Sequence, residues 1–438
     1  MLKVLSIIDP IFGMIEKLIK SITGKYTDGF LSIVANFIQK GTFLIVTVLL
    51  ARIFGPKLFG EYVLLKQAFD VLIVCILFGG DKSLIYFSAK DKNDGANKLF
   101  GVIKFLVLTV CLLFVISLFI RDELLVNYEF SYNSFFLIVF ATTILLNLIL
   151  IFIESYFIGI KSLKTYFKSV IISSLLYIPL SCFFGYFYGI IGVFVAFLFQ
   201  YLVQFLFIYF NEEDIFNKNR SLDVKKDLKQ LYSFSLPIGI GEILVSGTAF
   251  LTSLILIKYA SFEQLGIFNV AMRMVMFIVF IPNLLNNVLL SYLSVELNKE
   301  KFLIKTVLLN LLLSGGVGFV FYLFSNQIFS LFGWGLNDNL NDVFVYLILA
   351  ILPFCSSLVL LQYLISIEKR WSYLFFRFLR EGLTVLFFGF YILSDIKADA
   401  LLLSKCFLYS NYISLLLLVL FVVFNYIYTS KTTTKTVL

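Results

Sequence analysis

The sequence contains no histidine among its 438 residues. This absence excludes histidine-based catalytic triads, zinc sites with histidine ligands and proton relays through imidazole. Charged residues are also scarce, at 14%, whereas a soluble domain typically has roughly 25%. The chain is instead 61% hydrophobic and 18% aromatic, which excludes a soluble globular protein.

Cysteine is also sparse, and its distribution predicts neither a disulfide framework nor a metal site. The five cysteines are odd in number, scattered, and lie inside apolar segments without the spacing of metal ligands: Cys75, Cys111, Cys182, Cys355 and Cys406. Buried thiols that behave as small hydrophobic side chains account for them. We therefore expect no metal and no cofactor.

Apolar windows recur along the whole chain, and each is long enough to cross the hydrocarbon of a bilayer, which needs about twenty residues. They predict an all-α integral membrane protein of about twelve transmembrane helices and leave no soluble catalytic domain, so an enzyme is not expected. The expected spans lie near residues 30–54, 62–80, 99–120, 134–159, 166–187, 189–210, 232–257, 265–291, 304–328, 342–366, 371–394 and 400–428.

The spans divide into two groups of six around a charged connector. We expect an N-terminal lobe at residues 30–210, a connector at 211–231, a C-terminal lobe at 232–428 and a tail at 429–438. Residues 1–29 precede the first span, and Ile11, Ile15, Leu18, Ile19 and Ile22 recur there at helical spacing opposite charged side chains. This pattern predicts an amphipathic helix on the membrane surface.

The basic residues predict the orientation in the membrane. Of the 35 Lys and Arg, 24 lie in alternate loops and the tails on one side, six lie in the loops on the other side, and five lie inside spans. Cytoplasmic loops carry the excess of Lys and Arg, so both termini are expected in the cytoplasm. The net charge of +8 is then a topology signal, and no nucleic-acid partner is expected.

The two groups of spans show an internal relation at a shift of 206 residues. The shift aligns Arg52 to Tyr62 with Lys258 to Phe268 and places Gly60 on Gly266. Because 206 residues cover six spans, an even number, both lobes have the same orientation, as in transporters with parallel repeats. The sequence therefore predicts two pseudo-symmetric six-helix lobes.

Residues Leu49 to Ser88 carry an apolar helix that ends in Arg-x-x-Gly-Pro, followed by Phe-Gly-x-Tyr and a Gly-rich turn. This segment resembles the multidrug/oligosaccharidyl-lipid/polysaccharide (MOP) exporter superfamily, and within it the Wzx-type polysaccharide flippase branch. The resemblance implies a MATE/MOP-like fold in the inner membrane of a bacterium and alternating-access transport of a polyprenyl-pyrophosphate-linked oligosaccharide to the outer leaflet. The cargo would be an O-antigen (lipopolysaccharide) or capsule repeat unit, and polysaccharide polymerase machinery would be a partner.

Ionisable residues inside the spans are the candidate site. Each such charge costs at least about 2.5 kcal/mol on insertion scales and needs a partner or a watery cavity. We expect the cations to line a central cavity and hold the pyrophosphate, Arg273 foremost, and the acids to provide counter-charge or coupling to protons or sodium. The cations are Lys40, Lys66, Arg273, Arg377 and Arg380, and the acids are Asp70, Glu154, Glu242 and Glu381. The spacing also predicts ion pairs four residues apart, Lys66 with Asp70 and Arg377 with Glu381.

Three other functions fit the sequence less well. A cation-coupled multidrug exporter of the same superfamily would have a cleft dominated by acids, whereas this chain has five cations within its spans. A lipid II flippase has a similar anionic substrate but often has extra helices, which are not apparent here. A membrane glycan polymerase or ligase would have a large outside loop, whereas the outside loops at residues 121–133 and 329–341 are short.

Overall fold

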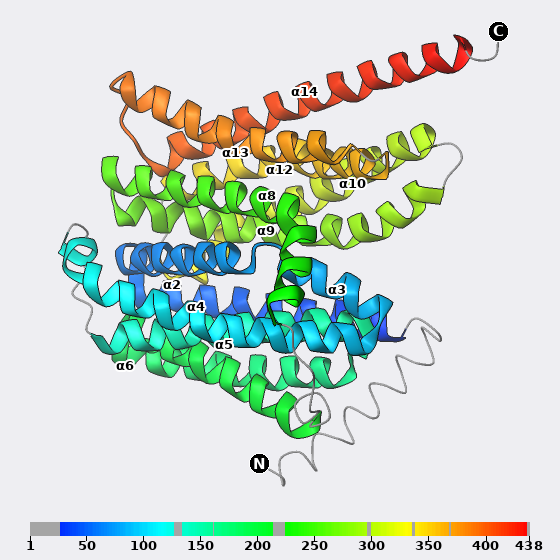
Figure 1. The fold of residues 1–438 in the computed structure, drawn as a ribbon. Coiled ribbons are helices and arrows are strands. Elements are labelled where there is room, and N and C mark those ends of the chain that lie inside the picture. The colour runs from blue at the N-terminus through cyan, green and yellow to red at the C-terminus, as the bar shows by residue number, and fades with distance from the viewer. Residues whose placement is uncertain are drawn as a thin grey trace. The chain divides into compact units, whose positions relative to one another are not determined.

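A computed structural model of the chain describes residues 27–126, 134–160, 162–212, 224–295, 299–334, 338–367 and 369–435. All regular secondary structure in these ranges is helical, which confirms the all-α prediction (Figure 1). The helices are α2 (Thr27–Leu77), α3 (Gly80–Lys90), α4 (Lys92–Val126), α5 (Ser134–Ile160), α6 (Lys164–Asn211), α8 (Val224–Tyr259), α9 (Phe262–Val295), α10 (Lys299–Leu323), α11 (Ser325–Ser330), α12 (Asp338–Ser366), α13 (Arg370–Leu393) and α14 (Ala400–Lys435). The amphipathic repeat expected at Ile11 to Ile22 and most of the expected connector lie outside the described residues.

The helix α6 is a hairpin of two spans. A straight helix of its 48 residues would be about 72 Å long, more than twice the thickness of the hydrocarbon. Gly189, with φ 60° and ψ −142°, interrupts the helix, and the rings of Phe184 and Phe199 stack with centroids 6.0 Å apart on either side of it. Tyr177 and Phe197 also stack, at 4.9 Å. The chain therefore reverses at Gly189, where the sequence predicts a turn between the fifth and sixth spans.

A similar break divides α2, which corresponds to the first two expected spans. Gly55 has φ 70° and ψ 175°, and Pro56 follows it. Glycine adopts positive φ without steric cost, and proline lacks the N–H that would continue a helix. The Gly-Pro pair therefore ends one helical segment and begins the next.

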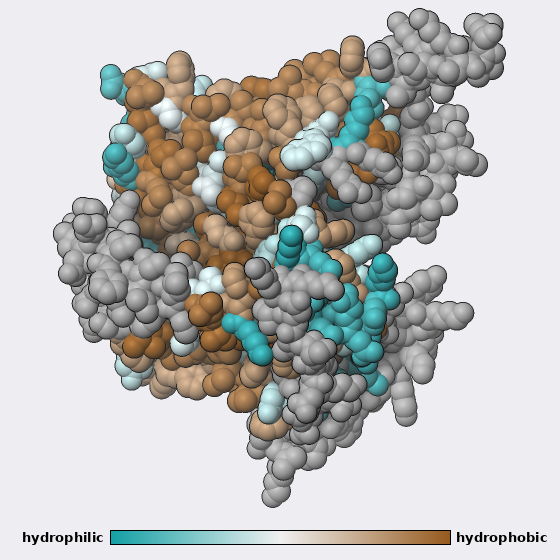
Figure 2. Space-filling model, in the orientation of Figure 1, coloured by the Kyte–Doolittle hydropathy of each residue, from teal (hydrophilic) through white to brown (hydrophobic). Residues whose placement is uncertain are grey.

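Within the described residues, eight helices are long and apolar enough to cross a membrane, with α2 and α6 counted once each. The two further expected spans correspond to α4 and α13. Many large apolar side chains on these helices are exposed, among them Leu312 (75%), Leu386 (66%) and Phe424 (70%). Hydrophobic residues cover most of the described surface that faces the viewer in Figure 2. Such a surface is stable in lipid and not in water, which confirms the membrane prediction.

The described residues form two compact units, and two helices contribute to both. One unit consists of the described residues of Met1–Leu50 and Leu72–Glu242, and the other of Ala51–Val71 and Ile243–Leu438. The segment of α2 around Gly60 thus belongs with the C-terminal helices, and the beginning of α8 belongs with α3 to α6.

In the first unit, α5 packs against α3, α4 and α6. Its interior contains large side chains with almost no exposure, including Tyr156, Phe157, Tyr177, Phe194 and Phe197. The beginning of α8 lies against the turn between α2 and α3. A Cβ atom at Gly239 would lie 2.6 Å from the carbonyl oxygen of Phe78, and the hydroxyl of Tyr232 approaches the carbonyl oxygen of Ile76 at 3.5 Å.

In the second unit, α12 packs against α9, α10, α13 and α14. Here α2 crosses α9 at two glycines. A Cβ atom at Gly60 would lie 1.8 Å from the carbonyl oxygen of Phe262, and one at Gly266 would lie 2.3 Å from that of Pro56. The contact is reciprocal under the 206-residue shift, because the shift relates Gly60 to Gly266 and Pro56 to Phe262. Only glycine allows two helix backbones to approach this closely.

Candidate functional site

The ion pair between Lys66 and Asp70, which the sequence predicts, is present on α2 in the second unit. Lys66 also lies over the ring of Phe69, 5.2 Å from its centroid. The side chain of Lys66 is 16% exposed and that of Asp70 is 51% exposed. The lysine charge therefore has a carboxylate and an aromatic face as neighbours, and the carboxylate remains open to other ligands.

The second predicted pair involves Glu381, which is paired with Arg380 on the same helix. The carboxylate of Glu381 accepts hydrogen bonds from two nitrogens of Arg380, at 3.0 and 2.7 Å, while Arg377 donates to the hydroxyl of Tyr373 at 2.9 Å. Arg380 is buried and lies over the ring of Phe354 on α12, 4.3 Å from its centroid. The sequence does not predict this adjacent pair, in which the guanidinium of Arg380 also packs on a ring of the neighbouring helix.

Arg273 and Lys40 are both exposed, Arg273 on α9 and Lys40 on the first segment of α2. Arg273 makes no hydrogen bond or ion pair with any described residue. It lies one helical turn after Asn269, whose amide oxygen approaches the amide nitrogen of Gln67 on α2 at 3.5 Å. The second unit thus carries Lys66, Asp70 and Arg273 on α2 and α9, the two helices that cross at the glycines.

The acids Glu154 and Glu242 lie in the first unit and are half-buried. The carboxyl of Glu154 on α5 is within hydrogen-bonding reach of the hydroxyl of Tyr166 on α6, and that hydroxyl also meets the side chain of Gln204. A carboxyl that has a hydroxyl as its hydrogen-bond partner can hold a proton or act as a counter-charge. No group of three or more metal-ligating side chains occurs in the part of the chain that the structure describes.

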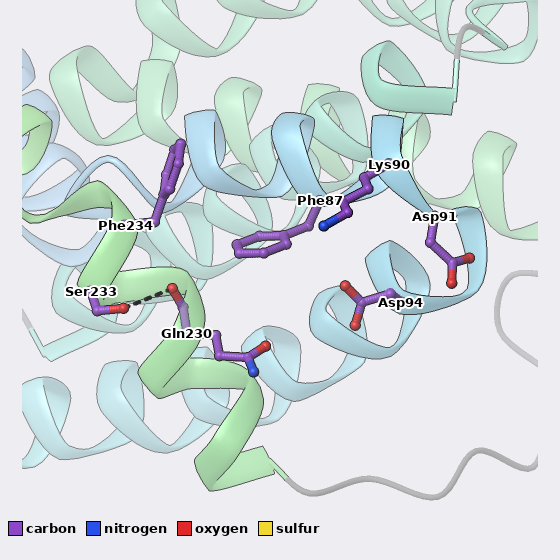
Figure 3. A pocket seen from close by; sticks show the side chains of 7 residues that line it. All are labelled: Phe87, Lys90, Asp91, Asp94, Gln230, Ser233 and Phe234. Atoms are coloured by element: carbon purple, nitrogen blue, oxygen red, sulfur yellow. Dashed lines mark hydrogen bonds between the residues drawn. The ribbon is translucent and has the colours of Figure 1, made fainter.

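The structure also shows a cavity that the sequence did not predict. It has a volume of about 660 Å³ in the first unit and lies between the α3–α4 turn and the beginning of α8 (Figure 3). Its lining combines two aromatic rings with five polar side chains: Phe87, Lys90, Asp91, Asp94, Gln230, Ser233 and Phe234. The two segments are separated by more than 130 residues, and no pattern in either segment indicates the other.

Lys98 is the buried residue behind this cavity. Its side chain is 1% exposed, pairs with the carboxylate of Asp94, and lies over the ring of Phe87, 4.6 Å from the centroid. In the charge pattern it counts as a cytoplasmic loop cation, whereas the structure places it inside the unit. Lys98 directly precedes the expected span at residues 99–120, and nothing in the sequence there indicates that its side chain is buried.

The sequence of residues 26–294, more than half of the chain, matches the family model described as polysaccharide biosynthesis protein. No curated protein matches the sequence.

Several solved structures share the fold. The lipid II flippase MurJ, in an inward closed conformation, has a TM-score of 0.73 and 16% identity over 90% of this chain and 87% of its own. An inward-facing multidrug resistance MATE transporter of the MOP superfamily has a TM-score of 0.66 and 15% identity over 87% and 94%. A MOP superfamily transporter from Pyrococcus furiosus, described as having a binding pocket of reverse polarity, has a TM-score of 0.66 and 12% identity over 90% and 93%. The sequence match shows that the chain belongs to the polysaccharide biosynthesis protein family, and its fold is similar to those of MOP superfamily transporters.

Proposed function

We propose that this protein is a flippase of the Wzx type, which moves a polyprenyl-pyrophosphate-linked oligosaccharide from the cytoplasmic to the outer leaflet by alternating access. The substrate would be an O-antigen or capsule repeat unit, delivered to polysaccharide polymerase machinery outside. The protein would reside in the bacterial inner membrane with both termini in the cytoplasm. The match to the polysaccharide biosynthesis family and the MOP fold support this function.

The observation that carries the proposal is the exposed guanidinium of Arg273. It lies within the apolar span Phe262–Val279, and no described residue neutralises it. A charge at that depth is costly unless water or a ligand solvates it. Guanidinium groups bind the oxygens of phosphate through two parallel hydrogen bonds, so Arg273 is suited to the pyrophosphate of the substrate.

The other cations differ in their burial and in the contacts that the structure shows. Lys66 remains able to contact an anion beside its partner Asp70, whereas Arg380 is buried against Phe354 and Glu381. We therefore assign the pyrophosphate to Arg273 with Lys66 and Lys40 as further candidates. For Arg377 and Arg380 the contacts favour a role in organising α13.

Glycan export and lipid flipping test the proposal together. Arg273→Ala should abolish export of the glycan while the protein remains inserted, because charge-assisted hydrogen bonds worth about 1.5–3 kcal/mol disappear and binding weakens about tenfold or more. Arg273→Lys should retain part of the activity. The readouts are surface glycan in cells and, in proteoliposomes, translocation of a lipid-linked oligosaccharide. Lys397→Ala, which removes an exposed cation from the α13–α14 loop, is the matched control.

Full export by Arg273→Ala would contradict the phosphate role of this residue. A wild-type protein that translocates no lipid-linked oligosaccharide in proteoliposomes would contradict the function itself.

A lipid II flippase is the second candidate, because the fold is similar to MurJ with a TM-score of 0.73. Lipid II carries the same pyrophosphate but a different glycan, so the cations serve both substrates equally. Parallel flipping assays with lipid II and with an oligosaccharide-linked lipid separate the two. A cation-coupled drug exporter would instead confer resistance to organic cations in growth assays.

A further inference from the structure

The cavity between the α3–α4 turn and α8 has the chemistry of a carbohydrate site. Phe87 and Phe234 provide apolar rings, and Asp91, Gln230 and Ser233 provide hydrogen-bonding groups (Figure 3). A pyranose has the matching surface, with C–H groups on its faces and hydroxyls around its rim. The volume of about 660 Å³ lies within the range of roughly 300–1,000 Å³ that is usual for small-molecule sites.

The aromatic rings of the cavity are held in place by their neighbours. Tyr86 stacks on Phe234 with ring centroids 4.8 Å apart and an interplanar angle of 17°, and Phe87 meets Phe234 edge-on at 6.0 Å. The buried ammonium of Lys98 lies over Phe87 and pairs with Asp94. The buried Lys98 thus holds both Phe87 and Asp94 in place. A preorganised site requires such support from the residues behind its lining.

The charges around the cavity cancel, so the cavity does not favour an ionic ligand. Lys98 compensates the carboxylate of Asp94, and the remaining pair, Lys90 and Asp91, is of opposite sign. The cavity therefore has no excess charge that would attract a pyrophosphate or an organic cation. Its hydrogen-bonding groups and rings are suited to a neutral hydroxylated ligand.

The position of the cavity indicates how the sugar arrives. Gln230, Ser233 and Phe234 directly precede the apolar span Ile238–Tyr259. The charge pattern places this part of α8 and the α3–α4 turn on the cytoplasmic side. A sugar whose lipid anchor lies in the cytoplasmic leaflet would reach the cavity at that boundary.

We propose that this cavity binds a neutral pyranose of a lipid-linked glycan at the cytoplasmic face and so contributes to the choice of glycan before transport. The inference rests on the proposed flippase function and adds to it a sugar-recognition site separate from the intramembrane cations.

The test uses the full-length protein in lipid nanodiscs. A panel of neutral pyranoses, including glucose, galactose, mannose, rhamnose, N-acetylglucosamine and N-acetylgalactosamine, is examined by saturation-transfer NMR. We expect at least one to bind the wild type and to bind Phe234→Ala about 3- to 10-fold more weakly, because a stacking ring is lost. Phe234→Tyr keeps the ring and should retain binding. Phe210→Ala removes an exposed ring at the end of α6, outside the cavity, and should bind as the wild type does.

A second arm identifies the source of the sugar. The same pyranose linked to a bilayer-anchored lipid should bind more tightly than the free sugar, because anchoring raises its effective concentration at the membrane surface. Equal binding of the two forms overturns the assignment to a lipid-linked glycan. Binding of no pyranose in the panel, or equal binding by Phe234→Ala and the wild type, overturns the sugar site.

The export assay separates this inference from the proposed function. Loss of export by Phe234→Ala, with normal insertion and thermal stability, supports the cavity. If Arg273→Ala abolishes export and Phe234→Ala leaves it unchanged, the cavity inference fails while the flippase function stands.

Discussion

Replacement of Gly60 by alanine should destabilise the second unit. The new Cβ atom would lie 1.8 Å from the carbonyl oxygen of Phe262, whereas side-chain carbons in proteins essentially never come closer than 3.0 Å. The missing distance, 3.0 − 1.8, is about 1.2 Å. A backbone carbonyl inside α9 cannot rotate away as a flexible side chain can, so α2 and α9 must separate and lose contacts along their crossing. Overpacking of this kind typically costs about 1–3 kcal/mol.

Replacement of a matched glycine by alanine should have the opposite effect on stability. Gly247 lies inside α8, and a Cβ atom there would meet nothing within 4 Å. Gly247→Ala should therefore be neutral or should stabilise by up to about 1 kcal/mol, which is the difference in helix propensity between the two residues. The contrast between Gly60→Ala and Gly247→Ala isolates the crossing from the general effect of replacing a helical glycine.

Thermal unfolding of the purified protein in one detergent is the assay. A cost of 1–3 kcal/mol corresponds to a decrease in Tm of roughly 2–10 °C, with no decrease for Gly247→Ala. The double variant Gly60→Ala/Gly266→Ala should lose less than the sum of the single variants, because the first substitution already separates the helices that the second would push apart. Equal Tm values for Gly60→Ala and Gly247→Ala, or strictly additive effects at the two crossing glycines, would refute the reasoning.

Two further predictions concern topology and the buried ion pair. Reporter fusions at Asn127, Asn217 and Asn339 should give outside, inside and outside signals, as the distribution of basic residues predicts, and an inside signal at Asn339 would break that assignment. Glu381→Gln should lower the free energy of unfolding by about 3 kcal/mol, because the buried guanidinium of Arg380 loses its counter-charge. The double variant Glu381→Gln/Arg380→Met should recover part of that loss in the same unfolding assay, and a double variant no more stable than Glu381→Gln would contradict the account.

The membrane fold could be predicted from the sequence because the bilayer imposes one strong rule. Every spanning helix needs about twenty apolar residues, so the sequence on either side of Gly55 and of Gly189 predicts two spans in each case. The helices α2 and α6 confirm these pairs, including the reversal at Gly189. The rule does not depend on tertiary contacts, and this independence is why it could be applied before the structure was known.

The candidate site was predictable to the extent that it is local. The pair of Lys66 and Asp70 follows from helical spacing, whereas Arg380 and Glu381 are adjacent, a spacing at which side chains do not normally face each other. Arg380 also contacts the ring of Phe354 on another helix, and no local rule can show such a contact. The cavity at Phe87 and Phe234 and the inward turn of Lys98 depend in the same way on the tertiary structure.

The reciprocal contact of Gly60 with Phe262 and of Gly266 with Pro56 has the form of an isologous interface, in which one surface patch meets its own copy across a two-fold axis. An ancestral chain of six spans could have formed this contact by dimerising, with the same glycine from both subunits at the axis. Duplication and fusion of its gene would have turned an intermolecular interface into an intramolecular one without any new residue at the crossing. Coexpression of residues 1–210 and 211–438 as two separate chains would show whether that older mode of assembly still operates.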